Sequence, residues 1–199
     1  MTAQPTELDG RRARRGRNRE AVVDALLELF REGDLNPSVA AVAERSGVSL
    51  RSVFRYFNDL DEMGRIAIAR HFNTVRHLFE LPNAGEGTRA ERIEALVQQR
   101  IAAHEGVAPV IRATLIRAPF QPVIAEAVRN RRAFLRRQVD RQFATELKKL
   151  STTERFSVAA AIDALTSFET LELLRTDRAM SAGKAAAVLR DSIDRLLPS

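Results

Sequence analysis

The 199-residue sequence predicts an all-α protein of about nine helices, with three short N-terminal helices followed by a larger helical region. Apolar residues recur every three to four positions along most of the chain, as on a helix with one buried face. No stretch alternates apolar and polar residues as a strand would, and neither an internal repeat nor a Gly/Ser-rich linker is present. The length is sufficient to bury a core in one large or two small domains.

Composition argues against several classes of protein. Cysteine is absent and only three histidines occur, so we expect no disulfide, metal site or cofactor. The first residues show no secretory signal, and no run of about 18 apolar residues predicts a membrane span. No phosphate-binding Gly loop, HExxH or GxSxG motif occurs. We therefore expect a cytoplasmic protein that does not bind a membrane and is not an enzyme.

Positive charge is unevenly distributed. The chain has 32 Lys+Arg against 26 Asp+Glu, a net charge of +6 that favours polyanions only modestly. Residues 11–19 carry six arginines and no acid. Residues 129–149 form a second basic segment, which we interpret as a solvated helix face. The alternative for that segment is a surface for an acidic ligand, a partner or flanking DNA.

The N-terminal part is predicted to hold a basic arm and a first helix. Residues 1–17 lack apolar periodicity, so we expect a disordered arm there. Residues 18–32 form the first helix, because their apolar residues lie on one stripe. That stripe consists of Val22, Val23, Leu26, Leu27 and Phe30.

Two short capped helices are expected next. Ser38 caps the second helix, and Gly47 ends it because glycine tolerates the positive backbone angle of a tight turn. Ser49 caps the third helix. We expect its inner side to be formed by Val53, Phe54 and Phe57. We expect its outer side to be formed by Leu50, Arg51, Ser52 and Arg55.

The remaining elements are also predicted to be helical. Asp59 and Glu62 resemble a capping box for a fourth helix that extends to about Glu80. Pro109 is expected early in a separate helix, where proline is tolerated. The remaining expected helices cover residues 88–104, 122–150, 152–175 and 181–197.

Three helices within about 45 residues, with a short glycine turn between the second and third, make a helix-turn-helix unit. In such a unit the third helix lies in the DNA major groove, where arginine can pair with guanine. A basic arm can follow phosphates or enter the minor groove, so we assign Arg11, Arg12, Arg14 and Arg15 to DNA. The alternative is an ordinary three-helix bundle without a DNA role.

The stretch "AVVDALLELFREGDLNPSVAAVAERSGVSLRSVFRYFNDLDEM" resembles the N-terminal domain of the TetR family of bacterial transcriptional regulators. The clear similarity covers residues 18–70. It implies a DNA-binding domain over 18–62 and a helical effector-binding and dimerisation domain over 63–199. The DNA contacts that it implies are Ser38, Ser49, Leu50, Arg51, Ser52, Arg55, Tyr56 and Asp59. Phe54 stands where the family often has Tyr, and Leu60 where it often has Lys.

The resemblance also implies a homodimer that binds a palindromic DNA operator and is released by a small molecule, as a repressor. The candidate residues for the effector pocket are His71, His77, Thr114, Phe120 and Phe168. The candidate residues for the dimer interface are Leu165, Phe168, Leu171, Val188, Leu189 and Ile193. The alternative for the latter group is the core of the domain itself.

Two other functions remain open at this level. A small-molecule carrier or a protein-interaction adaptor could have the same fold without binding DNA. Phe54 and Leu60 motivate this alternative, because they replace residues that contact phosphates in the family.

Overall fold

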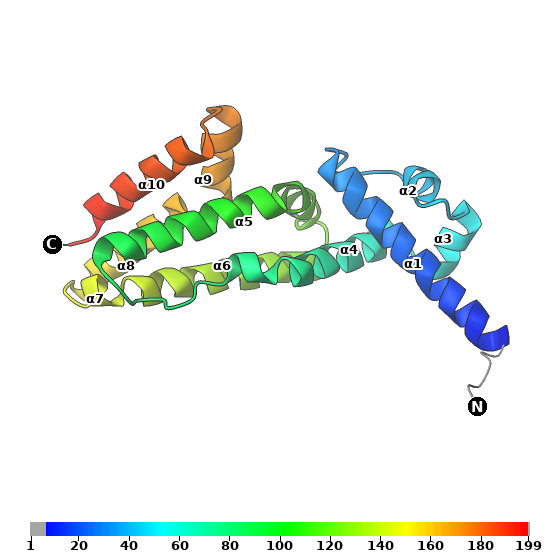
Figure 1. The fold of residues 1–199 in the computed structure, drawn as a ribbon, viewed down its shortest axis with the longest axis horizontal. Coiled ribbons are helices and arrows are strands. Elements are labelled where there is room, and N and C mark those ends of the chain that lie inside the picture. Colours follow the sequence, from blue (N-terminus) through cyan, green and yellow to red (C-terminus); the bar gives the residue numbers. More distant parts are fainter. Residues whose placement is uncertain (1–6, 199) are drawn as a thin grey trace. The chain divides into compact units, whose positions relative to one another are not determined.

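The computed structural model describes residues 7–198, and every regular element in that range is helical (Figure 1). The described range contains ten α-helices, the 3-10 helix η1 and the π-helical turn η2. Their bounds are α1 Glu7–Arg31, α2 Val39–Ser46, α3 Leu50–Tyr56, α4 Leu60–Thr74, η1 Arg76–Phe79, α5 Arg89–Arg117, α6 Pro122–Gln142, α7 Ala144–Leu147, α8 Thr152–Leu165, α9 Phe168–Glu172, η2 Leu173–Asp177 and α10 Ala182–Leu196. Within this range no helix is long and apolar enough to cross a bilayer.

The chain divides into two compact units. Unit 1 comprises the chain up to Thr74 together with residues 108–125, and unit 2 comprises residues 75–107 and 126–199. This division lies later than the expected boundary after residue 62. The whole of α4 belongs to unit 1, and α5 contributes to both units.

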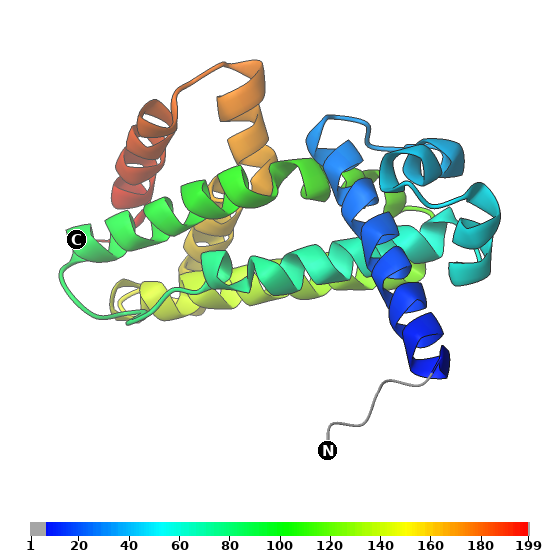
Figure 2. The same cartoon turned by 45° about the vertical axis from the view of Figure 1, so that its right-hand side comes forward.

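Unit 1 is built around the apolar stripe of α1. Helices α2 and α4 both pack against α1, and α3 follows α2 at a short turn (Figures 1 and 2). The predicted stripe residues are buried, as are Val53 and Phe57 of the third-helix segment. Phe54 was expected on the inner side and is instead 55% exposed, whereas Tyr56 is 9% exposed. Val53, Tyr56 and Phe57 share a face at spacings of three and four, which places Phe54 about 100° away.

The first helix differs from the predicted disordered arm. It begins at Glu7 and continues without a break to Arg31, so the basic segment within residues 11–17 is helical. Arginine has a high intrinsic helix propensity. Extending a helix that is already held by packing requires no new nucleation, which explains why a segment without apolar periodicity is helical. Residues 1–6 of the expected arm lie outside the described range.

Other predicted helix bounds are also corrected. The fourth helix ends at Thr74 and not near Glu80, and the expected helix over 122–150 is divided into α6 and α7. The separate helix around Pro109 is part of α5, which is one helix with an internal proline. Proline cannot donate a backbone hydrogen bond, but Val107 and Ile111 are buried on either side and their packing supports the helix there. The expected helix over 152–175 is divided, because the Ser167 hydroxyl accepts from the Thr170 amide at 3.2 Å and starts α9.

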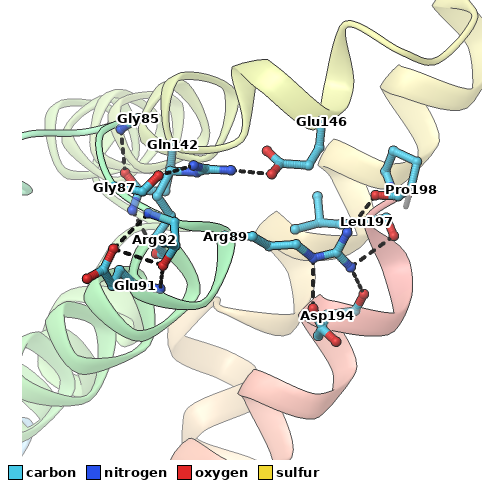
Figure 3. Close-up of polar contacts among 11 residues, drawn as sticks. Gly85, Gly87, Arg89, Glu91, Arg92, Gln142, Glu146, Asp194, Leu197 and Pro198 are labelled. Atoms are coloured by element: carbon cyan, nitrogen blue, oxygen red, sulfur yellow. Dashed lines mark hydrogen bonds and ion pairs between the residues drawn. The ribbon is translucent and has the colours of Figure 1, made fainter.

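Unit 2 has its own core, made from α5, α6, α7, α8, α9 and α10. Its largest fully buried side chains are Phe143, Leu96, Leu147, Ile162, Leu171, Leu189 and Ile193. Polar contacts secure the start of α5 (Figure 3). Arg92 forms a buried ion pair with Glu146 and donates to the Gly87 carbonyl at 2.6 Å.

Arg89, one helical turn before this pair, anchors the end of α10. Its Nε donates to Asp194 Oδ1 at 2.8 Å, and its guanidinium also reaches the Leu197 carbonyl at 3.2 Å (Figure 3). Gln142 of α6 donates to the Arg92 carbonyl at 2.7 Å and accepts from the Gly85 amide at 3.0 Å. The loop before α5 is therefore fixed to α6, while α5 is fixed to α6, α7 and α10.

Candidate nucleic-acid interface

The helix-turn-helix geometry follows from three local caps. The Ser38 hydroxyl accepts from the Ala41 amide at 3.1 Å and starts α2. Gly47 has φ 65° and ends α2 in the left-handed region that glycine tolerates. The Ser49 hydroxyl accepts from the Ser52 amide at 3.4 Å and starts α3. The sequence predicted all three caps, and together they set the angle at which α3 leaves α2.

The outer face of α3 carries apolar and cationic groups without an acid. Leu50, Arg51, Phe54 and Arg55 are all exposed. Ser52 is half-buried, and its hydroxyl accepts from Ser49 at 3.0 Å and from Arg55 at 3.5 Å. A short helix with small and cationic residues at its start can approach base edges closely. Its exposed apolar side chains suit contact with thymine methyl groups.

Tyr56 lies where α1 and α3 meet. Its hydroxyl accepts from Asn18 Nδ2 at 3.4 Å and from the Arg55 guanidinium at 3.3 Å. The hydrogen bond from Arg55, followed by that from Asn18, lowers the pKa of this hydroxyl below its usual value. Because both bonds are accepted ones, the Tyr56 hydroxyl retains its own proton for a further acceptor.

Arginines of α1 surround the same site. The Arg15 guanidinium lies 5.9 Å from the centre of the Tyr56 ring, and the Arg55 guanidinium lies 5.3 Å from it. Arg19 lies 5.2 Å from the centre of the Phe57 ring. These distances are typical of cation–π contacts. The basic segment of α1 and the end of α3 therefore form one cationic surface, which we call the α1–α3 face.

The other predicted DNA-binding residues have different positions. Arg12 and Arg14 are exposed on α1, and Arg11 lies in the same helix. Asp59 accepts from the Glu62 amide at 2.6 Å, so its carboxylate is a helix cap. A DNA contact at Asp59, at the N-terminus of α4, stays a prediction.

Asn18 and Arg19 were missed by sequence reasoning as site residues. Arg19 was visible only as part of the arginine run. Asn18 carried no signal of its own, because its role depends on the position of Tyr56, which is 38 residues away in sequence.

The five candidate pocket residues are divided between the two units. In unit 1, His71 is buried, the Thr114 hydroxyl donates to the Val110 carbonyl at 2.6 Å, and Phe120 is 83% exposed. In unit 2, His77 is exposed on η1, and Phe168 lies against the His104 ring at 5.2 Å. The exposure of Phe120 contradicts its assignment to an interior pocket.

Three of the six predicted dimer-interface residues belong to the core of the protomer. Leu171, Leu189 and Ile193 are buried within unit 2, where they pack against other helices of the same chain. Leu165 and Phe168 are half-buried, and Val188 is exposed. The spacing of apolar residues identified the inner side of α10 correctly, but that side is covered by its own chain.

A different stripe of α8 is uncovered. Phe156 is 76% exposed, and Ala160 and Ala164 follow it at intervals of four on the same side of the helix. Sequence reasoning missed Phe156, which is separated from the alanine-rich part of α8 and was not included in the interface.

No protein-family model matches the sequence, and no curated protein matches it. Solved structures do resemble the chain. A transcriptional regulator from Rhodococcus sp. Rha1 has a TM-score of 0.68 and 22% identity, covering 89% of this chain and 95% of that chain. The multidrug binding protein EbrR, complexed with imidazole, has a TM-score of 0.51 and 20% identity, covering 91% of this chain and 95% of that chain. The fold is TetR-like, as the resemblance of residues 18–70 predicted.

Proposed function

We propose that this protein is a transcriptional regulator that binds a palindromic DNA operator as a homodimer and is released by a small molecule, acting as a repressor in the cytoplasm. The observation that carries the proposal is the α1–α3 face, where an exposed helix without acids meets a run of arginines. The TetR-like fold, shared with a transcriptional regulator, supports the same conclusion.

Residues of α3 would read the base sequence. Arg51 lies in the first turn of α3 and is exposed, so it can reach a base edge when the N-terminal end of α3 enters the major groove. Arginine recognises guanine through two parallel hydrogen bonds to O6 and N7. Leu50 and Phe54 would contact thymine methyl groups on either side of it.

Residues at the junction of α1 and α3 would bind the phosphates. Arg55 donates to the Tyr56 hydroxyl, and Arg15 lies near the Tyr56 ring. These two guanidiniums and the hydroxyl proton of Tyr56 would donate to phosphate oxygens. Arg12 lies one turn before Arg15 on the same face of α1 and extends the contact along the backbone. Because this segment is helical, its arginines lose less conformational freedom on binding than those of a disordered arm would.

The homodimer would form through α8 and α10, which pack against each other within the chain. Phe156 and Val188 supply exposed apolar area, and Ala160 and Ala164 allow close helix approach. A two-fold bundle of four helices would cover this stripe and place two α3 helices about 34 Å apart. The effector would bind in unit 2. EbrR, whose structure resembles this chain, is a multidrug binding protein, which supports a ligand-responsive fold.

The first test is fluorescence anisotropy of the purified protein with DNA flanking its own gene and with a scrambled duplex of equal length. Each titration is run at two salt concentrations. Sequence-selective binding that weakens with salt is expected, because phosphate contacts release counterions. Equal, weak binding to every duplex tested, including a library of random sequences, would refute sequence-specific regulation.

A further inference from the structure

Three polar side chains of unit 2 hold η1, the short turn that directly follows α4. Gln99 of α5 donates its amide to the Leu78 carbonyl at 2.9 Å. Gln138 of α6 donates its amide to the Phe79 carbonyl at 2.7 Å. Arg100 of α5 donates to the side-chain oxygens of both glutamines, at 2.8 Å in the case of Gln138. We call Gln99, Arg100 and Gln138 the η1 anchor.

Arg100 determines the orientation of both amides. A glutamine side chain has an oxygen that accepts and an NH2 group that donates, and the two ends are nearly equal in size. With both oxygens directed at the Arg100 guanidinium, both NH2 groups must face the η1 carbonyls. Turning either amide around would place its NH2 against the guanidinium, donor against donor. One buried arginine therefore fixes two hydrogen bonds that it does not itself make.

The Arg100 side chain is placed for this role. It is 3% exposed, and it also donates to the Leu135 carbonyl at 3.1 Å. Among the residues that the structure describes, all its hydrogen-bond acceptors are neutral. Burial lowers the pKa of Arg100 to about 10, although the charge of Asp163 acts in the opposite direction. The guanidinium remains protonated at neutral pH and keeps its full set of donors.

The surface of α5 is also shaped to receive η1. A Cβ atom on Gly106 would lie 2.3 Å from Leu78 Cδ1, which is impossible without displacing Leu78. Glycine inside a helix destabilises it by about 1 kcal/mol relative to alanine, so its presence here has a packing reason. The η1 anchor holds the Leu78 backbone, and Gly106 leaves room for the Leu78 side chain.

The position of η1 in the chain makes this attachment consequential. Thr74 is the last residue of α4 and of the first segment of unit 1, and η1 begins at Arg76 in unit 2. Unit 1 contains the α1–α3 face. The η1 anchor therefore fixes the point at which the chain of the helix-turn-helix unit enters unit 2.

We propose that Arg100 is a positioning residue for operator binding: through Gln99 and Gln138 it holds η1, and thereby the end of α4, so that the two helix-turn-helix units of a dimer keep one spacing. This proposal rests on the proposed function. Loss of the anchor weakens binding to a full palindrome, which requires both units at that spacing. Binding to a single half-site, which requires only one unit, is unaffected.

The test compares Arg100→Met with Arg137→Met. Methionine has a side chain of similar length to the buried part of arginine but no guanidinium. Arg137 is an exposed arginine of α6, so the control variant loses the same charge at the surface. Gln138→Met is the second variant. It removes one of the two η1 bonds and serves as the test if Arg100→Met does not fold, as judged by circular dichroism. Arg100→Lys retains the charge, but it carries its donors on one nitrogen and not on a planar fork, so partial recovery is expected.

Two readouts separate positioning from a structural role. Hydrogen exchange of peptides covering 75–79 is expected to accelerate in Arg100→Met and Gln138→Met, with α1 unchanged. Anisotropy is expected to show about tenfold weaker binding to the palindrome, as for loss of one buried hydrogen-bond partner. The affinity of both variants for the half-site is expected to stay within about twofold of wild type. For Arg137→Met, the ratio of palindrome affinity to half-site affinity is expected to equal that of wild type.

Unchanged exchange in both variants would overturn the anchor. Faster exchange together with equal losses of affinity for the palindrome and for the half-site would overturn the positioning role. If the wild-type protein bound no operator, the proposed function would fail and with it the positioning of DNA-binding units. The exchange data would then still decide whether the anchor holds η1.

Discussion

Removal of the charge of Glu146 is expected to destabilise unit 2 strongly. The Arg92–Glu146 pair joins α5 to α7, and its side chains are only 7% and 6% exposed (Figure 3). In Glu146→Gln the amide oxygen can still accept from Arg92, but the guanidinium becomes a buried charge without a counter-ion. Breaking a buried pair by removing one partner costs about 3–5 kcal/mol.

The control is a second ion pair made by α5. Arg190 Nη1 of α10 lies 2.9 Å from Glu94 Oε2, and the two side chains are 37% and 44% exposed. Water and salt screen this pair, so Glu94→Gln is expected to cost about 0–1 kcal/mol. Both substitutions are isosteric and change one charge, and they differ mainly in burial.

Urea denaturation followed by circular dichroism measures both variants. A domain with a total stability of about 5–15 kcal/mol would show a clear shift of the midpoint for Glu146→Gln and little for Glu94→Gln. Equal shifts for the two variants would refute the argument that burial decides the contribution of these pairs. A shift in slope without a shift in midpoint would indicate a changed unfolded state, which this reasoning does not predict.

Three further predictions concern the DNA surface, the dimer and the dependence on pH. Arg51→Ala should weaken operator binding by about 1–3 kcal/mol and relax specificity at one base pair, and unchanged anisotropy titrations would exclude base contact by Arg51. Phe156→Glu should convert the proposed dimer to a monomer of unchanged helicity, and an unchanged mass by light scattering would place the interface elsewhere. Burial, followed by the charge of Arg31, lowers the pKa of His71 below 6.5, so wild type should lose stability as pH falls through 6.5 towards that lowered value. His71→Leu should lose less over the same range, and parallel losses in urea titrations at several pH values would contradict this assignment.

Local features of the fold could be predicted from the sequence. Ser38 and Ser49 cap helices as expected, because each cap hydrogen bond joins residues only three apart. Gly47 was predicted by the same kind of reasoning, since its backbone angle is a property of one residue. The apolar stripe of α1 spans several turns, and its periodicity therefore identified the buried face.

Where the periodicity was short, the prediction was wrong. The seven-residue helix α3 offers fewer than two full repeats of an apolar pattern. Phe54 was predicted on the inner side, but Tyr56, which is also aromatic and had been assigned to neither side, is buried instead. Only packing against α1 decides which of the two is buried.

Apolar periodicity also cannot show which chain covers an apolar face. Leu189 and Ile193 were equally suitable for a partner subunit and for the protomer's own core, and the structure places them in the core. Phe156 is the converse case, because its exposure depends on which helices lie beside α8. Burial is a property of the assembled helices, so it cannot be read from one of them.

The sequence by itself determined the helical class, the helix caps and the outward position of Arg51 and Arg55, because each depends on residues within a few positions of one another. Tertiary structure alone decided the contacts that join distant segments. Arg92 and Glu146 are separated by 54 positions, and Gln138 and Phe79 by 59. Hydrogen bonds and ion pairs act over a few ångströms in space, and residues so far apart in sequence come within that distance only after the helices have packed.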